Sequence, residues 1–187
     1  MKSISEIRTE FEACRGSRAE LYEMYAYDTR MGVQKLIQKY QKQDEKLANE
    51  RLRLKQMRQY EEKYSHCDYI CGIDEVGRGP FAGPVVAAAV ILPKDCDILY
   101  LNDSKKLSEK KRELLYDEIY EKAVAIGIGM SSEKVIDEIN ILQATYKAMQ
   151  QAISKLSVKP DLLLNDAVTI PDVNIEQVPI IKGDAKS

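Results

Sequence analysis

Residues 69–92 read YICGIDEVGRGPFAGPVVAAAVIL, and the predicted fold class depends on this stretch. Its two ends, Tyr69–Ile73 and Pro84–Leu92, are short apolar runs of the kind that form buried strands. An acidic pair, Asp74 and Glu75, stands directly after the first run, and a loop with glycine and proline leads to the second. The stretch therefore predicts two neighbouring strands with two carboxylates at the end of the first.

The residues that follow alternate between strand and helix spacing. Further strand-like runs lie at 123–130, 161–165 and 177–181, and helical spacing begins near Ser108 and again after Ser132. Short links between the first three strands predict an antiparallel meander, and we expect the last strands to be reached through helical crossovers. The order predicts an α/β fold in which a mixed five-stranded sheet has flanking helices.

Residues 1–67 predict a helical N-terminal extension that precedes a domain at 68–187. Ser3 and Glu6 have the spacing of a capping box. From about Val33 to Tyr64 there is no Gly or Pro, and the apolar residues form one narrow stripe made of Leu36, Tyr40, Leu47, Leu54 and Met57.

Such a stripe is too thin to hold a core alone, so we expect this helix to pack on the following domain, pair with another helix or project into solvent. Two roles stay open for it. It is a solvated charged helix with one apolar face, or a basic arm that lengthens contact with a nucleic-acid duplex.

The composition limits the kinds of catalytic and metal site that the chain can form. The chain has 187 residues, enough for one domain and an extension, and a formal net charge of −2. It contains neither an apolar run long enough to span a membrane nor a secretory signal, so we expect a cytoplasmic protein. The single histidine, His66, argues against Ser–His and Cys–His catalysis and against a zinc site built on Cys67 and Cys71. Catalytic groups are therefore expected among the carboxylates.

Four acidic residues occupy predicted strand ends, namely Asp74, Glu75, Asp166 and Asp184. Taken singly, an Asp at a strand end is a common turn former or helix cap. A mixed α/β sheet, however, brings the ends of neighbouring strands together, so these carboxylates can converge. Hard divalent cations relieve the repulsion within such a group, and ligands that offer only oxygen favour Mg2+ or Mn2+.

The loop after the acidic pair has glycines at positions 77, 79 and 83 around Arg78. Glycine lets a ligand approach the backbone closely, and arginine offers paired hydrogen bonds to phosphate. Because the loop directly follows two candidate metal ligands, it is predicted to hold a nucleic-acid backbone.

Several motifs together resemble bacterial ribonuclease HII, the type 2 ribonuclease H. They are DEVGRG at 74–79 with the PFAGPVVAAAVIL that follows, NDSKKLS at 102–108, INILQAT at 139–145, ND at 165–166 and KGD at 182–184. The resemblance covers residues 68–187, with the motifs in the family's order. The segment DTRMGVQKL at 28–36 also resembles the N-terminal arm of some bacterial members.

The resemblance implies a ribonuclease H-like fold and an endonuclease that hydrolyses the RNA strand of RNA–DNA hybrids. It also implies nicking on the 5′ side of ribonucleotides embedded in duplex DNA, which leaves a 5′-phosphate. The implied catalytic residues are Asp74, Glu75, Asp166 and Asp184, which bind two Mn2+ or Mg2+ ions. The implied substrate-binding residues are Gly77, Arg78, Gly79 and Lys105, and we expect a monomer.

Family members continue beyond the point where this chain ends with a helix rich in small residues, further helices and a tyrosine. We therefore expect the C-terminal helices to be missing here, which leaves open a catalytically inactive fragment as an alternative. A resolvase-like nuclease on the same fold is a further alternative, against which the Gly77–Gly79 loop argues. Arg78 and Pro80 match the type 2 pattern better than that of the type 3 enzymes.

Overall fold

The computed structural model describes residues 1–80 and 82–180. The chain forms two compact units, Met1–Arg53 and Leu54–Ser187, and each is described by itself. Helix α3 (Met31–Met57) contributes its first part to one unit and its last residues to the other.

The Met1–Arg53 unit contains α1 (Ile4–Ala13), α2 (Ala19–Tyr25) and most of α3. The predicted capping box at the start of α1 is confirmed. The Ser3 hydroxyl accepts from the backbone N–H of Glu6 at 3.2 Å, and the Ser3 N–H donates to the Glu6 carboxylate at 2.6 Å. These two bonds satisfy amide groups that the first helical turn leaves without partners.

This unit has a small core of its own. Its buried side chains are Ile7, Phe11, Tyr25, Val33, Leu36, Ile37 and Tyr40. The Phe11 and Tyr40 rings are stacked, with centroids 4.8 Å apart and planes 6° apart. At the edge of the core, Asp44 accepts from Arg18 and from the Tyr22 hydroxyl. Leu36 and Tyr40 of the predicted stripe are thus covered by α1 and α2, which is the helix-pairing outcome, whereas Leu54 is buried in the other unit.

The Leu54–Ser187 unit begins with the end of α3 and α4 (Gln59–Lys63). Tyr60 and Tyr64 pack against a buried cluster made of Cys67, Leu162, Leu164 and Ile180. The segment before the first strand therefore belongs, in its packing, with the sheet. The domain boundary after residue 67 stays a prediction, because the packing units divide earlier along the chain.

The sheet has five strands in the order β3-β2-β1-β4-β5. They are β1 (Ile70–Val76), β2 (Val85–Ile91), β3 (Ala125–Ser131), β4 (Leu162–Asp166) and β5 (Glu176–Ile180). β1, β2 and β3 pair antiparallel, as predicted, whereas β4 runs parallel to both β1 and β5. The link between β2 and β3 is longer than predicted and contains α5 (Glu109–Lys122). The prediction of a mixed five-stranded sheet is confirmed.

The crossover from β4 to β5 differs from the prediction, because it is a loop and contains no helix. Apolar side chains of this loop, including Val168, Ile170 and Val173, pack on the core. The Gln177 amide group accepts from the Ile170 N–H at 2.8 Å and donates to the Ile170 carbonyl at 2.9 Å. The loop thus packs on the sheet unit's core, and Gln177 satisfies the backbone of its buried residue Ile170.

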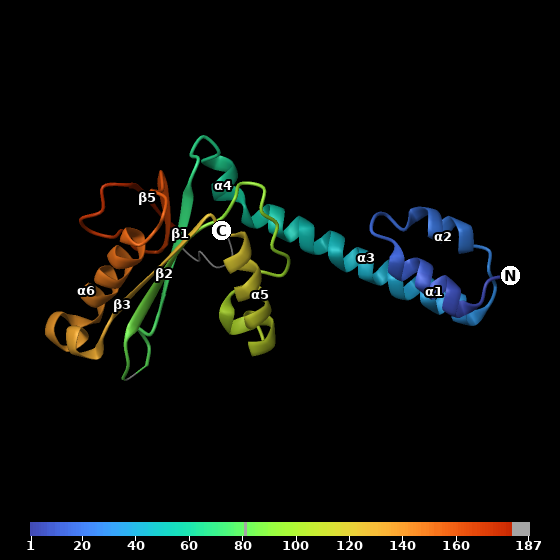
Figure 1. Ribbon diagram of the computed structural model, residues 1–187, viewed down its shortest axis with the longest axis horizontal. Coiled ribbons are helices and arrows are strands. Elements are labelled where there is room, and N and C mark those ends of the chain that lie inside the picture. Colours follow the sequence, from blue (N-terminus) through green and yellow to red (C-terminus); the bar gives the residue numbers. More distant parts are fainter. Residues whose placement is uncertain (81, 181–187) are drawn as a thin grey trace. The chain divides into compact units, whose positions relative to one another are not determined.

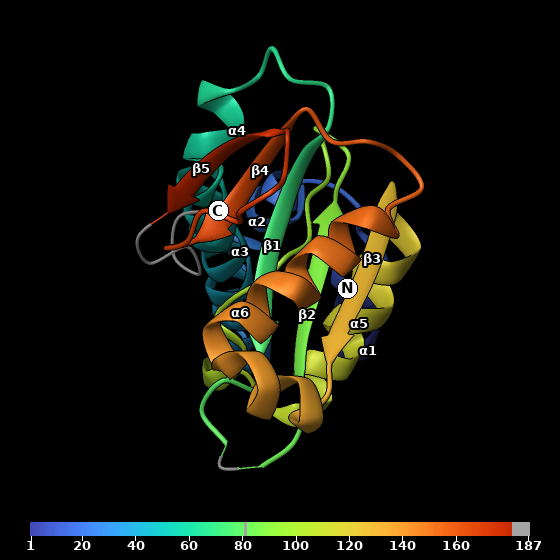
Figure 2. The ribbon, with the colours of Figure 1, turned by 90° about the vertical axis from the view of Figure 1, so that its left-hand side faces the viewer.

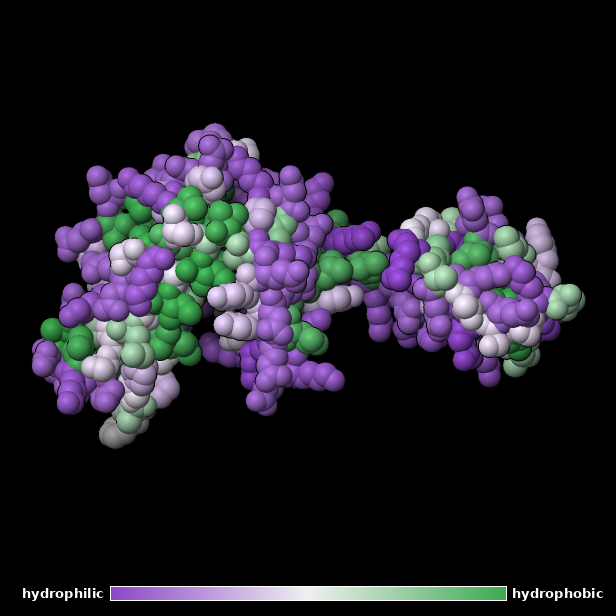
Figure 3. All heavy atoms as spheres, in the orientation of Figure 1, coloured by the Kyte–Doolittle hydropathy of each residue, from purple (hydrophilic) through white to green (hydrophobic). Residues whose placement is uncertain are grey.

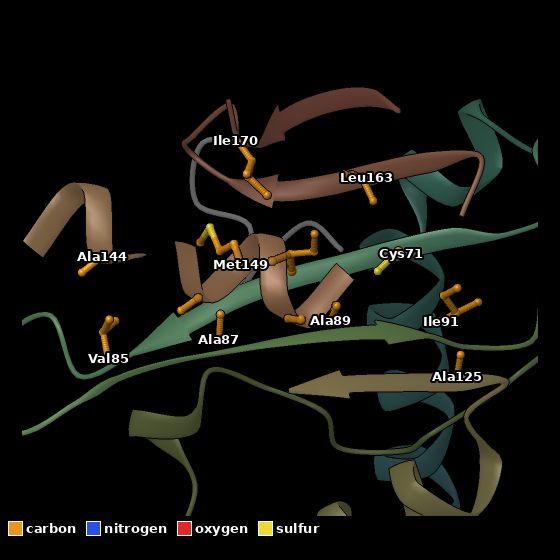
Figure 4. Close-up of a cluster of buried hydrophobic side chains, with 13 residues drawn as sticks. Cys71, Val85, Ala87, Ala89, Ile91, Ala125, Ala144, Met149, Leu163 and Ile170 are labelled. Carbon is orange, nitrogen blue, oxygen red and sulfur yellow. The ribbon is translucent and has the colours of Figure 1, made fainter. Parts of the chain in front are cut away.

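Helices lie on both faces of the sheet, with α6 (Glu133–Ser154) on one and α5 (Glu109–Lys122) on the other (Figures 1 and 2). The main core lies between α6 and the sheet, where Met149 and Leu163 meet small residues such as Ala87, Ala89 and Ala144 (Figure 4). Small side chains on both surfaces let the helix and the sheet approach closely.

The closest approach is between β3 and α6. A Cβ atom at Gly129 would lie 1.9 Å from the carbonyl oxygen of Ala148, and one at Gly127 would lie 2.0 Å from that of Ala152. Both obstacles are backbone atoms, so they cannot turn aside as a flexible side chain does. Glycine is required at these positions by packing against the helix.

Helix α6 is broken once, at Asn140, which has φ 70° and ψ 164°. The Asn140 side-chain oxygen accepts from the backbone N–H groups of Leu142 (3.0 Å) and Gln143 (3.1 Å). These bonds cap the second half of α6, because they satisfy amides that start a new helix. The helical segment predicted after Ser132 is thus two helices joined at Asn140.

Replacing Phe11 by Ala should unfold the Met1–Arg53 unit. Truncating a fully buried Phe typically costs about 3–5 kcal/mol, and a core this small has little stability in reserve. Hydrogen exchange followed by mass spectrometry should show loss of protection in α1 and α2. The matched control is Met24→Ala, since Met24 is 64% exposed. Equal protection in both variants would contradict the independent core.

Replacing Gly129 by Ala should destabilise the Leu54–Ser187 unit by about 1–3 kcal/mol or more, because the added methyl group overlaps the α6 backbone. Gly72→Ala is the matched control, because a Cβ there meets nothing within 4 Å. Urea denaturation of both variants measures the difference. A Gly129→Ala midpoint that equals the Gly72→Ala midpoint would show that the helix does not lie this close to the sheet.

Candidate metal and nucleic-acid site

Two of the predicted carboxylates lie side by side on neighbouring parallel strands. Ile73 of β1 pairs with Asn165 of β4, and the next residue along each strand is an aspartate, Asp74 on β1 and Asp166 on β4. Paired residues of adjacent strands project from the same face of a sheet. The strand pairing therefore brings these two carboxylates to one edge and one face of the sheet.

Asp161 holds this pairing in register at the opposite end of β4. Its carboxylate accepts from the backbone N–H groups of Asp68 (3.0 Å) and Tyr69 (2.9 Å), and its own N–H donates to the Tyr69 carbonyl. A shift of one residue would turn every side chain of a strand to the other face. Sequence reasoning treated Asp161 only as the start of a strand and missed this anchor.

Glu75 lies within β1 and does not project from the same face of the sheet as Asp74. The prediction placed Asp74 and Glu75 after the strand, but β1 continues to Val76 because its pairing with β2 extends to Val86. Successive strand residues alternate between faces. Glu75, which pairs with the buried Ala87, is therefore on the α6 face, and its carboxylate accepts from Arg78 at 3.0 Å.

The four-carboxylate set as a whole stays a prediction. Asp184, the fourth predicted ligand, lies outside the described residues. Within residues 1–80 and 82–180 there is no group of three or more His, Cys, Asp or Glu side chains that could hold a metal ion. The pair Asp74 and Asp166 is the part of the predicted site that the described strands bring together.

The glycine loop after β1 is shaped by contact with the start of β2. Gly77 has φ 103°, and a Cβ atom there would lie 2.3 Å from the carbonyl oxygen of Pro84. Only glycine tolerates both the left-handed backbone and this approach. Gly79 is different, since a Cβ there meets nothing within 4 Å. Gly77 thus has a structural requirement, while the backbone at Gly79 is open to a ligand.

The predicted phosphate contact Lys105 lies in a short 3-10 turn, η1 (Ser104–Lys106), between β2 and α5. The Asp103 carboxylate accepts from the Lys105 N–H at 3.0 Å. Lys105 and Lys106 are both exposed. The turn therefore presents two cations to solvent from a backbone with a defined shape.

A buried amide pair next to Asp166 was also missed by sequence reasoning. The Asn165 side chain is 1% exposed and donates to the Gln177 side-chain oxygen at 2.8 Å. Gln177 in turn binds the Ile170 backbone, so the pair ties the end of β4 to the loop that follows. No signal in the sequence marks this contact, because the two residues lie on different strands.

A cavity of about 500 Å³ lies on the same sheet face as Asp74 and Asp166. Gly72, Val90 and Leu164 form part of its lining, together with the charged side chains Arg58 and Asp97. On β3, the side chains of Ile128 and Met130 are also exposed on the face away from α6. Hydrophobic areas are visible on the surface of this unit in Figure 3.

The cysteines of the sheet unit are divided by burial. Desolvation raises the pKa of the Cys71 thiol to about 12, and burial likewise raises the pKa of Cys67. Cys96 is only partly buried. A raised thiol pKa disfavours the thiolate, which is the metal-binding and reactive form.

The arrangement of strands and helices is that of ribonuclease H-like proteins. The crystal structure of the ribonuclease H2 from Pyrococcus horikoshii OT3 superimposes with a TM-score of 0.54, at 24% identity, over 64% of this chain and 65% of that chain. This likeness shows the fold.

Sequence comparison gives the family. The family model described as "Ribonuclease HII" matches residues 71–186, and the one described as "Ribonuclease HII N-terminal domain" matches residues 3–65. A protein named Ribonuclease HII from Lachnoclostridium phytofermentans is 63% identical over 185 residues, which are 98% of this chain and 73% of that protein. The chain belongs to the ribonuclease HII family.

A second relative with the same name, from Bacillus cytotoxicus, is 54% identical over 170 residues, or 90% of this chain and 65% of that protein. The chain thus spans about two thirds of the length of several relatives. Among the described residues, no helix combines the length and the apolar character needed to cross a membrane.

The thiol environments predict a labelling pattern and a pH effect. At pH 8, iodoacetamide should modify Cys14 and Cys96 in the folded protein and spare Cys67 and Cys71. Because Cys71 ionises near pH 9.0 when unfolded but near 12 when folded, stability should fall as the pH rises above about 9. Peptide mapping and alkaline urea melts measure both. Rapid modification of Cys71 at pH 8 in native protein would refute the burial.

Proposed function

We propose that this protein is a metal-dependent endonuclease that hydrolyses the RNA strand of RNA–DNA hybrids. In the same proposal it nicks duplex DNA on the 5′ side of embedded ribonucleotides and leaves a 5′-phosphate. The observation that carries the proposal is the adjacent placement of Asp74 and Asp166, in a chain of the ribonuclease HII family. A cytoplasmic, monomeric protein belongs to the same proposal.

Asp74, Glu75, Asp166 and Asp184 would hold two Mn2+ or Mg2+ ions. The pair Asp74 and Asp166 fits such ions, because both project from one face of the sheet and offer only oxygen ligands. Glu75 projects from the opposite face and accepts from Arg78, so Glu75 and Asp184 belong to the proposed set through the family resemblance. When bound, the ions supply Lewis-acid stabilisation of the scissile phosphate and lower the pKa of the attacking water. The protein then needs no nucleophilic side chain of its own.

The substrate would be held by groups on two loops, the one that follows β1 and the one between β2 and α5. The open backbone at Gly79 allows close approach of a nucleotide, and the ribose 2′-hydroxyl is the group by which RNA differs from DNA. Arg78 donates to the Glu75 carboxylate, and Lys105 is exposed. Both side chains offer cations for the phosphate groups of the substrate.

The test is cleavage of a labelled DNA duplex that contains one ribonucleotide, and of an RNA–DNA hybrid, with Mn2+, with Mg2+ and with EDTA. Because the chain spans 73% of the Lachnoclostridium protein, a second sample is extended with the part of that protein that lies outside the matched residues. Metal-dependent nicking 5′ of the ribonucleotide by either sample supports the function. Nicking by the extended sample alone identifies the given chain as the inactive alternative.

A four-way DNA junction included as a substrate separates the resolvase-like alternative. Cleavage of the junction without cleavage of either ribonucleotide-containing duplex would overturn the hybrid-directed assignment. Cleavage of none of the substrates by either sample would overturn the proposal of a nuclease.

Replacing Asp74 by Asn should reduce cleavage to the background level while leaving the fold intact, because the substitution removes a charged metal ligand and little volume. Asp137→Asn is the matched control, since Asp137 is an exposed carboxylate on α6. Circular dichroism of both variants checks folding. Turnover by Asp74→Asn at the rate of Asp137→Asn, in the same metal concentration, would remove Asp74 from the site.

A further inference from the structure

We propose that Arg112 is a positioning residue for the substrate contact at Lys105. Arg112 is on α5, outside every motif that the sequence singles out, and it holds the turn that carries Lys105 and Lys106. This inference rests on the proposed function, because Lys105 has a role only if a nucleic acid is bound.

The Arg112 side chain contacts both ends of the turn that carries Lys105. A single guanidinium nitrogen of Arg112, Nη1, donates to the carbonyl oxygen of Ser104 at 3.2 Å and to that of Leu107 at 2.7 Å. Ser104 begins the 3-10 turn and Leu107 is its C-cap. The two exposed lysines lie between the two carbonyls that Arg112 binds, so Arg112 ties their backbone to the first turns of α5.

The turn's other hydrogen bonds set its shape but not its position. The Asp103 carboxylate accepts from the Lys105 N–H, and the Leu107 N–H donates to the Ser104 carbonyl at 3.2 Å. The Lys106 N–H also donates to the Asp103 carbonyl at 2.9 Å, and all three bonds join residues of the turn itself. Leu107 adjoins Ser108, the N-cap of α5, so without the Arg112 bonds the turn could keep its shape and still rotate about this short link.

A second cation of α5 holds the start of the same loop. The Lys111 ammonium lies 4.4 Å from the centre of the Tyr100 ring, within the range of a cation–π contact. Tyr100 has φ 70°, an uncommon conformation for a residue other than glycine. Two consecutive residues of α5 therefore contact this loop. Lys111 contacts Tyr100 near its start, and Arg112 binds the turn at its end.

The basic side chains of the turn and of α5 have two different roles. Within the described residues, neither Lys105 nor Lys106 takes part in an ion pair, so both remain available for phosphate groups. Arg112 directs its charge at backbone carbonyls instead. Loss of Arg112 should consequently weaken substrate binding through mobility of Lys105, and leave the chemical step at the carboxylates unchanged.

The experiment compares Arg112→Met, Lys105→Ala and the double variant in steady-state cleavage of the hybrid, using whichever of the two samples above is active. Arg112→Met should raise KM about fivefold with kcat unchanged, as Lys105→Ala does. The double variant should resemble Lys105→Ala alone, because residues that act through one contact are not additive. The matched control is Lys110→Met, which removes the same charge from an exposed site on the same helix turn.

A merely structural or merely electrostatic role gives different results. If Arg112→Met leaves KM unchanged, raises it no more than Lys110→Met, or multiplies with Lys105→Ala, the proposal is overturned. Hydrogen exchange of the peptide that covers residues 100–108 provides a readout without substrate. Exchange should be faster in Arg112→Met than in Lys110→Met, and equal rates would overturn the proposal even if no sample cleaves. Absence of cleavage with faster exchange would count against the proposed function and leave the attachment of the turn standing.

Discussion

The pairing of β1 with two different neighbours is the constraint on which the rest of the sheet unit depends. β1 is antiparallel to β2 on one side and parallel to β4 on the other. The first pairing brings the two ends of the glycine loop together at Val76 and Val86, and the second brings Asp166, distant in sequence, beside Asp74. Asp161 holds the parallel register through two backbone amides. A strand with only one of these partners would carry half of the candidate site.

Close packing of α6 on the sheet supports this arrangement from the opposite face. Glycines on β3 and alanines on α6 allow contact between the backbones themselves, and the apolar loop between β4 and β5 completes the cover. The face that carries Asp74 and Asp166 is less densely covered, with a cavity and exposed apolar side chains. The two faces of the sheet therefore have different roles. The α6 face provides stability, and the opposite face presents Asp74 and Asp166.

The groups proposed to contact nucleic acid are on loops. In each loop, contacts to backbone atoms fix the position of these groups. Gly77 is held against Pro84 by shape, and the turn of Lys105 is held by the Arg112 side chain. Loops positioned by a rigid framework commonly carry binding residues. The Met1–Arg53 unit follows another principle, since its three helices close a small core that includes stacked aromatic rings. The N-terminal family domain that matches residues 3–65 includes the whole of this core.

Local patterns in the sequence were sufficient for the kinds of element and for the family. The alternation of apolar runs predicted the five strands and the two helices of the sheet unit, and Ser3 with Glu6 predicted the first helix cap, because these features depend on residues close in the chain. The candidate carboxylates, the glycine loop and Lys105 were found from motifs of the same local kind. The extent of β1 beyond Glu75 and the helix-free crossover to β5 depended instead on pairing and packing partners. Only the tertiary structure could place Glu75 on the α6 face, Asp161 on the backbone just before β1, and Arg112 on the turn of Lys105. These contacts join residues that are distant in sequence or depend on strand register, and a single sequence carries no local signal for either.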